Sequence, residues 1–111
     1  MITHTDFVDQ LKAEVPESSG LVAEHLVDND ELLLHLLMSD LLRLVASTFS
    51  EGRTTVTDRL LAFVDRCLRE GDDKVVNAVC VSFVEGFGAY PDESEALLSR
   101  WPSALRAELG R

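Results

Sequence analysis

Apolar side chains recur every three or four residues through three consecutive segments of the chain, residues 31–49, 56–70 and 73–87. This is the spacing of the buried face of an α-helix, and each segment is long enough for about four turns or more. Gly71 and Asp72, between the last two segments, are typical of the end of one helix and the N-cap of the next. Because this connection is so short, the two helices should form an antiparallel hairpin. The sequence therefore predicts an all-α protein.

Shorter helices are expected at the N-terminal end. Residues 6–14 and 21–27 show helical periodicity on either side of Pro16. Pro16 should end the first helix, because the residue before a proline avoids helical dihedrals. Asp30 is expected to be the N-cap of the long helix over residues 31–49.

Two short helices are expected at the other end. Asp92 and Glu95 form a variant of the capping box for a helix over residues 93–99. Pro102 suits the first position of a last helix, and Gly110 lies where its C-terminal cap is expected.

The 111 residues are enough for one domain, residues 1–111, with a single hydrophobic core. The apolar fraction is 46% and the aromatic fraction only 6%, so leucine and valine must supply most of that core. The helix over residues 31–49 has only one narrow polar stripe, which indicates contacts with other helices on two sides. We predict a compact bundle of five to seven helices in consecutive antiparallel hairpins, with the helices of residues 31–49 and 73–87 at its centre. The stripe consists of His35, Ser39, Asp40, Arg43 and Ser47.

The charge is strongly negative and unevenly distributed. The net charge is −10, and residues 1–42 hold nine acidic residues against Lys12 alone. Such a surface repels nucleic acid and anionic lipid, and it attracts a cationic partner by long-range steering. Solubility alone is the other interpretation of this acidity. The predicted partner-binding residues are Asp6, Asp9, Glu14, Glu17, Glu24, Asp28, Asp30, Glu31 and Asp40.

No motif for a cofactor, a metal or catalysis is found. Gly86-Phe87-Gly88 follows a helix and lacks the third glycine of a dinucleotide motif, so we interpret it as a helix stop. Residues 28–30 resemble the start of a calcium loop, but leucines occupy the positions of the later ligands. No Gly-x-Ser-x-Gly motif marks a serine nucleophile. We expect a protein without enzymatic activity and without a cofactor.

The histidines and cysteines are interpreted as structural. The three histidines, His4, His25 and His35, lack the helical spacing with which two ligands converge on a metal ion. Cys67 and Cys80 lie in apolar stretches and are expected to be buried, inert thiols that do not face one another.

Five polar or aromatic residues near the C-terminal end have two interpretations each. Asn77, Ser82 and Glu85 are polar exceptions on an apolar helix, and they form either its solvent side or the lining of a groove that receives a partner. Tyr90 and Trp101 flank a short helix. Either they pack this helix against the core, or they are anchors of an interface with a partner.

A cytoplasmic location is expected. The N-terminal residues lack the basic and apolar regions of a signal peptide, and free thiols are typical of a reducing compartment. The longest apolar stretch, residues 32–49, contains charged residues, which disfavours a membrane span.

The segment from Arg59 to Phe87 resembles one helical hairpin of the HEAT or armadillo type. The likeness lies in an apolar first helix, a Gly-Asp-Asp turn and a Val-Val-Asn-Ala opening to the second helix. In size, charge and architecture the whole chain resembles small acidic helical bacterial proteins, which are uncharacterised or serve as immunity partners of secreted toxins. The second resemblance implies a cytoplasmic inhibitor that binds a basic toxin domain.

Three functional hypotheses follow from these observations. The leading one is a non-enzymatic protein-binding module, an immunity or inhibitor protein whose acidic residues steer a basic partner. The alternatives are a scaffold domain that forms homodimers through an exposed leucine face, and a small-ligand-binding protein. The last would need a cavity of a few hundred Å³ with convergent polar groups, about the size of ordinary ligand pockets.

Overall fold

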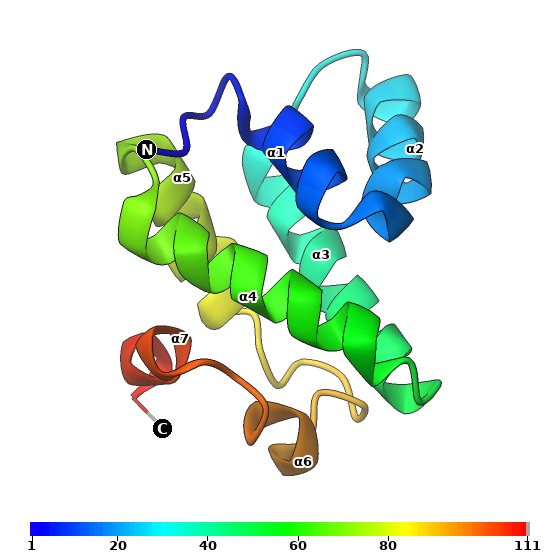
Figure 1. Cartoon of the computed structure of the whole chain (residues 1–111), viewed down its shortest axis with the longest axis vertical. Coiled ribbons are helices and arrows are strands. Elements are labelled where there is room, and N and C mark those ends of the chain that lie inside the picture. Colours follow the sequence, from blue (N-terminus) through cyan, green and yellow to red (C-terminus); the bar gives the residue numbers. More distant parts are fainter. Residues whose placement is uncertain (111) are drawn as a thin grey trace.

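The computed structural model describes residues 1–110, and in them all regular structure is helical apart from one isolated bridge (Figure 1). In chain order the elements are α1 (Phe7–Glu14), the 3₁₀ turn η1 (Pro16–Ser18), α2 (Ser19–Asn29), α3 (Leu34–Ser50), α4 (Thr54–Glu70), α5 (Asp73–Ala78), the π-helical segment η2 (Val79–Val84), α6 (Glu95–Leu98) and α7 (Ser103–Leu109). The seven α-helices confirm the predicted helical bundle.

The helix α3 lies at the centre of this bundle. It packs against α4 on one side and against α5 and η2 on another, while α2 contacts it near its N-terminal half (Figure 1). Its buried residues include Leu37, Leu41 and Val45, each with no exposed surface. Burying one such side chain contributes about 1.5–3 kcal/mol. The residues of the predicted polar stripe are exposed or half-buried, and Leu36 beside them is also exposed.

The hairpin between α4 and α5 forms as predicted. The Asp72 carboxylate accepts a hydrogen bond of 2.9 Å from the Val75 N–H and caps α5. Gly71 is extended rather than left-handed, and a Cβ there would lie 2.4 Å from the Cys67 carbonyl oxygen. The N-terminal segment is fixed beside this turn, since the Asp72 N–H donates to the Ile2 carbonyl oxygen at 2.9 Å.

The predicted start of the long helix at Asp30 is wrong. Asp30 has φ 59° and ends α2 in the left-handed conformation, and its N–H donates to the Leu26 carbonyl oxygen at 3.0 Å. The helix α3 begins only at Leu34. The reason is a contact outside the local sequence: the Leu33 N–H donates to the imidazole of His25 at 3.0 Å, which holds Leu33 in an extended conformation.

The predicted helix over residues 73–87 is shorter and changes its winding. From Val79 to Val84 it is a π-helix, and the Glu85 N–H donates to the Cys80 carbonyl oxygen at 3.1 Å. The helix ends there, three residues before Phe87. A π-turn rotates the following side chains relative to an α-helix and brings Ser82 toward α3.

The last two helices also differ from the prediction in their caps. Ser94, not Asp92, caps α6, because Asp92 forms an ion pair with Arg43 of α3 instead. Pro102 takes the N-cap position of α7 rather than its first helical position, and Gly110 is its left-handed C-cap with φ 82°.

The aromatic residues at this end behave differently from one another. Trp101 is buried, and its ring centroid lies 5.5 Å from that of Phe83 and 4.9 Å from that of Phe87, so it holds the α6–α7 segment on the core. Tyr90 is exposed, and its ring lies 4.0 Å from the guanidinium carbon of Arg43.

Both cysteines are free thiols, but only one matches the expected burial. Cys67 is buried, and burial raises the pKa of its thiol to about 12. Cys80 is half-buried, and burial together with the Glu108 side chain raises the pKa of its thiol to about 11. Both are therefore protonated and weakly nucleophilic at neutral pH.

None of the helices within residues 1–110 has the length and apolar character that crossing a lipid bilayer would require.

Candidate functional site

The nine acidic residues predicted to bind a partner fall into three groups of three in the structure. Three of them are engaged within the molecule. Asp6 accepts a hydrogen bond of 2.7 Å from the Thr3 N–H, Glu14 pairs with Arg66, and Glu17 pairs with Arg59. The hydrogen bond from Arg59 lowers the pKa of Glu17. The carboxylates of these three residues hold the N-terminal helices in place.

The second group gathers between α2 and α3. Glu24 and Asp28, one turn apart on α2, face Asp40 of α3 across a hollow of about 330 Å³. Leu21, His25, Asn29 and Leu36 complete its lining. Within residues 1–110, no lysine or arginine nitrogen lies within 4.0 Å of these three carboxylates. Their charge is thus directed at whatever enters the hollow.

Of the remaining three acidic residues, two lie beside the hollow and one lies elsewhere. Asp30 and Glu31 are exposed in the connection between α2 and α3, next to the hollow. Asp9 is exposed on α1 and does not line the hollow. The structure therefore brings together five of the nine predicted residues.

The local electrostatics of the hollow are unfavourable without a cation. Glu24 and Asp28 are a like-charged pair at i and i+4, which destabilises a helix by about 0.2–0.5 kcal/mol. Asp28 lies in the last turn of α2, where the helix dipole places partial negative charge and disfavours acidic side chains by about 0.3–1 kcal/mol. A bound cation would relieve both effects.

His25 is the buried polar group of this hollow. The residue is 3% exposed, and its Nε2 accepts a hydrogen bond from the Leu33 N–H at 3.0 Å. The proton of the neutral ring is therefore on Nδ1. Nδ1 has no hydrogen-bond partner within residues 1–110, and the nearest carboxylate oxygen, Oδ2 of Asp40, lies 3.8 Å away. A buried donor without a partner costs about 1–3 kcal/mol.

Several apolar side chains are exposed on the two helices that form the hollow and on the connection between them. Leu26 and Val27 are exposed on α2, and Leu33 and Leu36 are exposed at the start of α3. Leu36 also lines the hollow together with Asp40. A surface with apolar residues beside unpaired carboxylates fits an amphipathic basic segment better than it fits a free ion.

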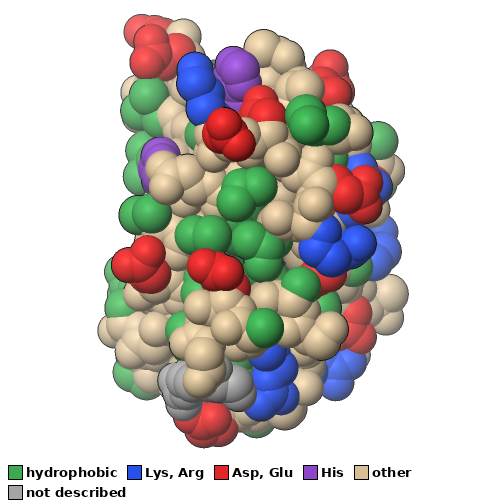
Figure 2. Space-filling model, turned by 90° about the vertical axis from the view of Figure 1, so that its left-hand side faces the viewer, with side chains coloured by type: hydrophobic (Ala, Val, Ile, Leu, Met, Phe, Trp, Pro, Cys, Tyr) green, Lys and Arg blue, Asp and Glu red, His purple; other side chains and the backbone are tan. Residues whose placement is uncertain are grey.

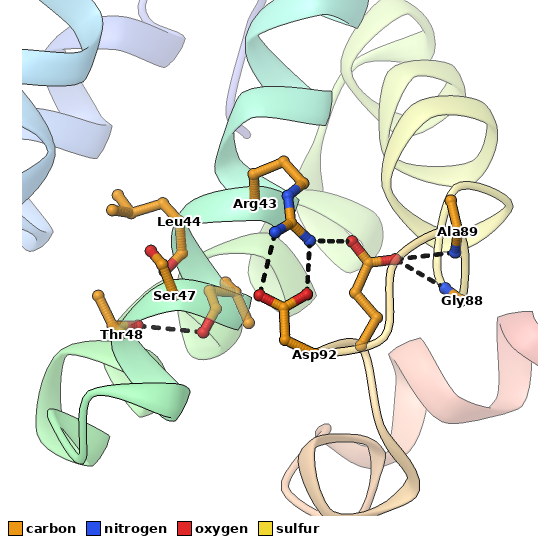
Figure 3. Close-up of polar contacts among 9 residues, drawn as sticks. Arg43, Leu44, Ser47, Thr48, Gly88, Ala89 and Asp92 are labelled. Atoms are coloured by element: carbon orange, nitrogen blue, oxygen red, sulfur yellow. Dashed lines mark hydrogen bonds and ion pairs between the residues drawn. The ribbon is translucent and has the colours of Figure 1, made fainter.

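A second hollow, of about 320 Å³, lies between α3 and η2 and shares Asp40 with the first. Its other charged residues, Arg43 and Glu93, are already paired (Figure 3). Arg43 donates from both terminal nitrogens to Asp92, at 2.9 and 3.0 Å, and to the fully buried Glu93 side chain at 2.7 Å. Glu93 in turn accepts hydrogen bonds from the N–H groups of Gly88 and Ala89, at 2.8 and 3.0 Å. This cluster fixes the segment between η2 and α6 against α3.

The pKa values of the Arg43 cluster reflect that pairing. Hydrogen bonds to Asp92 and Glu93 raise the pKa of Arg43 above its usual range, and the same contact lowers the pKa of Asp92. Both groups are therefore charged at neutral pH. The guanidinium of Arg43 is thus committed to the fold.

A third surface is apolar. Figure 2 shows hydrophobic side chains at the centre of the face that α5, η2 and α7 form. Val76, Cys80 and Leu109 are half-buried residues of these elements.

The sequence matches the family described as "Domain of unknown function (DUF7674)" over residues 8–111. The chain belongs to this family. Neither the curated proteins nor the solved structures include a significant match. The resemblances to HEAT repeats and to immunity proteins therefore stay predictions for this member of the family.

The structure of this family member also contains a polar cluster that the sequence analysis missed. Ser82 and His35 are joined by a hydrogen bond of 2.7 Å between Oγ and Nδ1, and the Asn77 amide lies 3.5 Å from His35 Nε2. The cluster joins α3 to the α5–η2 helix, and Glu85 takes no part in these contacts. The signal that could have predicted this cluster is the pair of polar residues on the otherwise apolar α5–η2 helix, Asn77 and Ser82, together with the polar stripe of α3.

Within the described residues 1–110, no group of three or more histidine, cysteine, aspartate and glutamate side chains is arranged to hold a metal ion.

Proposed function

We propose that this protein is a non-enzymatic binding module that receives a basic protein partner in the hollow between α2 and α3. The observation that supports it is a set of three carboxylates beside the exposed Leu36, with no lysine or arginine nitrogen within 4.0 Å of them in residues 1–110: Glu24, Asp28 and Asp40. The other predicted acidic residues, Asp30 and Glu31, extend the same negative surface along the connection.

Two physical effects would act in sequence during binding. The negative charge steers a basic partner and raises its association rate by about 10-fold to 1,000-fold, an effect that salt weakens. Contact then buries Leu36 and the neighbouring Leu33, which slows dissociation because apolar area is removed from water. Charge would thus set the rate of encounter and the leucines the lifetime of the complex.

The most specific form of this proposal is an immunity or inhibitor protein of the bacterial cytoplasm that covers a basic toxin domain. It is supported by the resemblance in size, charge and helical architecture, together with the acidic hollow. A toxin domain that acts on nucleic acid would carry the positive surface that such a hollow requires.

The test is a tagged pull-down from the native host at low and moderate salt, with wild type and two charge-reversal variants. In the hollow variant Glu24, Asp28 and Asp40 become lysine, and in the control variant the exposed residues Glu51, Asp73 and Glu85 become lysine. Both variants change the net charge equally. We expect a stoichiometric basic protein that wild type and control retain at low salt and the hollow variant loses. Equal retention by all three proteins would remove the proposal.

Homodimerisation is the second candidate, and the exposure of Leu33 and Leu36 on α3 favours it. Light scattering at high micromolar concentration distinguishes the two. A dimer that Leu36→Gln converts into a monomer would support this candidate, and a wild-type monomer would exclude it.

A further inference from the structure

On the basis of the proposed function, we infer that the hollow between α2 and α3 is a receptor for one arginine side chain of the partner, and that His25 and Asp40 form a contact that closes around it. The inference names the chemical group that the hollow recognises. It rests on the position of the carboxylates and on the buried, unpaired Nδ1 of His25.

The carboxylates come from two walls. Glu24 and Asp28 belong to α2 and Asp40 to α3, with His25 and Leu36 between them. A guanidinium group has five N–H donors in one plane and can bond carboxylates on two sides at once. A lysine ammonium is a more strongly hydrated point charge and satisfies such a divided site less well.

The histidine supplies the buried polar group of the hollow. Its side chain is 1% exposed, and its Nε2 accepts a hydrogen bond from the Leu33 N–H at 3.0 Å. That hydrogen bond fixes the orientation of the ring and leaves Nδ1 as the nitrogen without a partner within residues 1–110.

The unpaired Nδ1–H of His25 then has a specific use. Oδ2 of Asp40 lies 3.8 Å from this nitrogen, which is too distant for a hydrogen bond. A guanidinium held between Glu24, Asp28 and Asp40 draws the α3 carboxylate toward α2, the helix that carries His25. Asp40 then accepts from Nδ1–H, so the donor that is unpaired in the free protein gains a partner in the complex.

The experiment is an NMR titration of the whole protein with acetyl-Gly-Arg-Gly-amide, monitored by the ring nitrogens of His25 and the backbone amides. Two control peptides replace arginine with lysine or with citrulline, which has the same shape and no charge. We expect saturable shifts confined to α2 and α3 and a change at His25 Nδ1 with the arginine peptide. Binding should be at least about tenfold weaker for citrulline, since charge-assisted hydrogen bonds are lost.

Two protein variants separate the two contacts. Asp40→Asn should remove the shift change at His25 Nδ1. Asp28→Asn should weaken the binding of the arginine peptide, but at saturation the shift of His25 Nδ1 should still change. Asp73→Asn, which removes an exposed carboxylate outside the hollow, should leave both unchanged. Equal shifts with the arginine and lysine peptides, or no shift with either, would overturn the inference.

The peptide titration and the pull-down can fail separately. In one outcome the arginine peptide fails to bind while the hollow variant still loses its basic partner in the pull-down. In that case the inferred arginine site is wrong and the proposed function stands. If both experiments fail, the hollow is not a binding surface.

Discussion

At the scale of single residues, the structure depends on a few side chains that satisfy main-chain groups. Asp72 is the clearest case, because its carboxylate accepts from the N–H groups of Val75 and His4 and from the His4 ring. Hydrogen bonds from the His4 side chain and from the Val75 and His4 N–H groups lower the pKa of Asp72 to about 2. The ionised form is thus favoured in the folded protein more than in the unfolded chain.

This difference predicts a pH dependence of stability. A carboxyl whose pKa is lower in the folded state stabilises the fold at pH above its unfolded pKa of 3.8, and the stabilisation is lost as pH falls from about 4 to about 2. Asp72→Asn should therefore have a lower melting temperature than wild type at pH 7. Thermal unfolding across pH 2–7 should show the difference shrinking below pH 4. A difference in melting temperature that stays constant from pH 7 to pH 2 would show that ionisation of Asp72 does not stabilise the fold.

A pair of glycines gives a second prediction at this scale. A Cβ at position 71 would lie 2.4 Å from the Cys67 carbonyl oxygen, so Gly71→Ala should lower the free energy of unfolding by about 1–3 kcal/mol. Gly20 is the matched control, since it is exposed within α2 and its Cβ would have nothing within 4 Å. Gly20→Ala should raise the free energy of unfolding by about 0.5–1 kcal/mol. Urea unfolding measures both, and the opposite signs are the test.

At the scale of elements, the segment between η2 and α6 has little helical structure and is held by the Arg43 cluster (Figure 3). Glu93→Ala removes the buried acceptor of two main-chain N–H groups and one contact of Arg43. We expect a loss of about 1.5–3 kcal/mol in the free energy of unfolding. Hydrogen exchange should increase between Gly86 and Ser94. A uniform increase over the whole chain would contradict the idea of a local attachment.

The same cluster shows what the sequence could and could not predict about the elements. Helical periodicity predicted the helices because their apolar faces are local patterns. The N-caps predicted at Asp30 and Asp92 were wrong, because contacts with residues outside the capping motif decide where each helix begins. Asp92 pairs with Arg43, 49 residues away, and His25 takes the Leu33 N–H. A capping rule that considers only adjacent residues cannot include such competitors.

At the scale of the whole molecule, the acidic composition predicted a negative surface but not its distribution. Glu14 and Glu17 were expected to bind a partner, yet Arg66 and Arg59 of α4 neutralise them. Within residues 1–110, no arginine or lysine pairs with Glu24, Asp28 or Asp40, and Arg43 of the facing helix is bound to Asp92 and Glu93 instead. Which carboxylates stay unpaired depends on the arrangement of helices, and counting charges along the chain does not reveal it.

The central claim is that this unpaired charge captures a basic partner. The most direct test is the association rate of that partner with wild type, the hollow variant and the control variant, measured at several salt concentrations. The account predicts a rate at least about tenfold lower for the hollow variant at low salt, a control close to wild type, and little change in melting temperature for either. Equal rates for the hollow and control variants would contradict it, because net charge rather than this hollow would then govern the encounter.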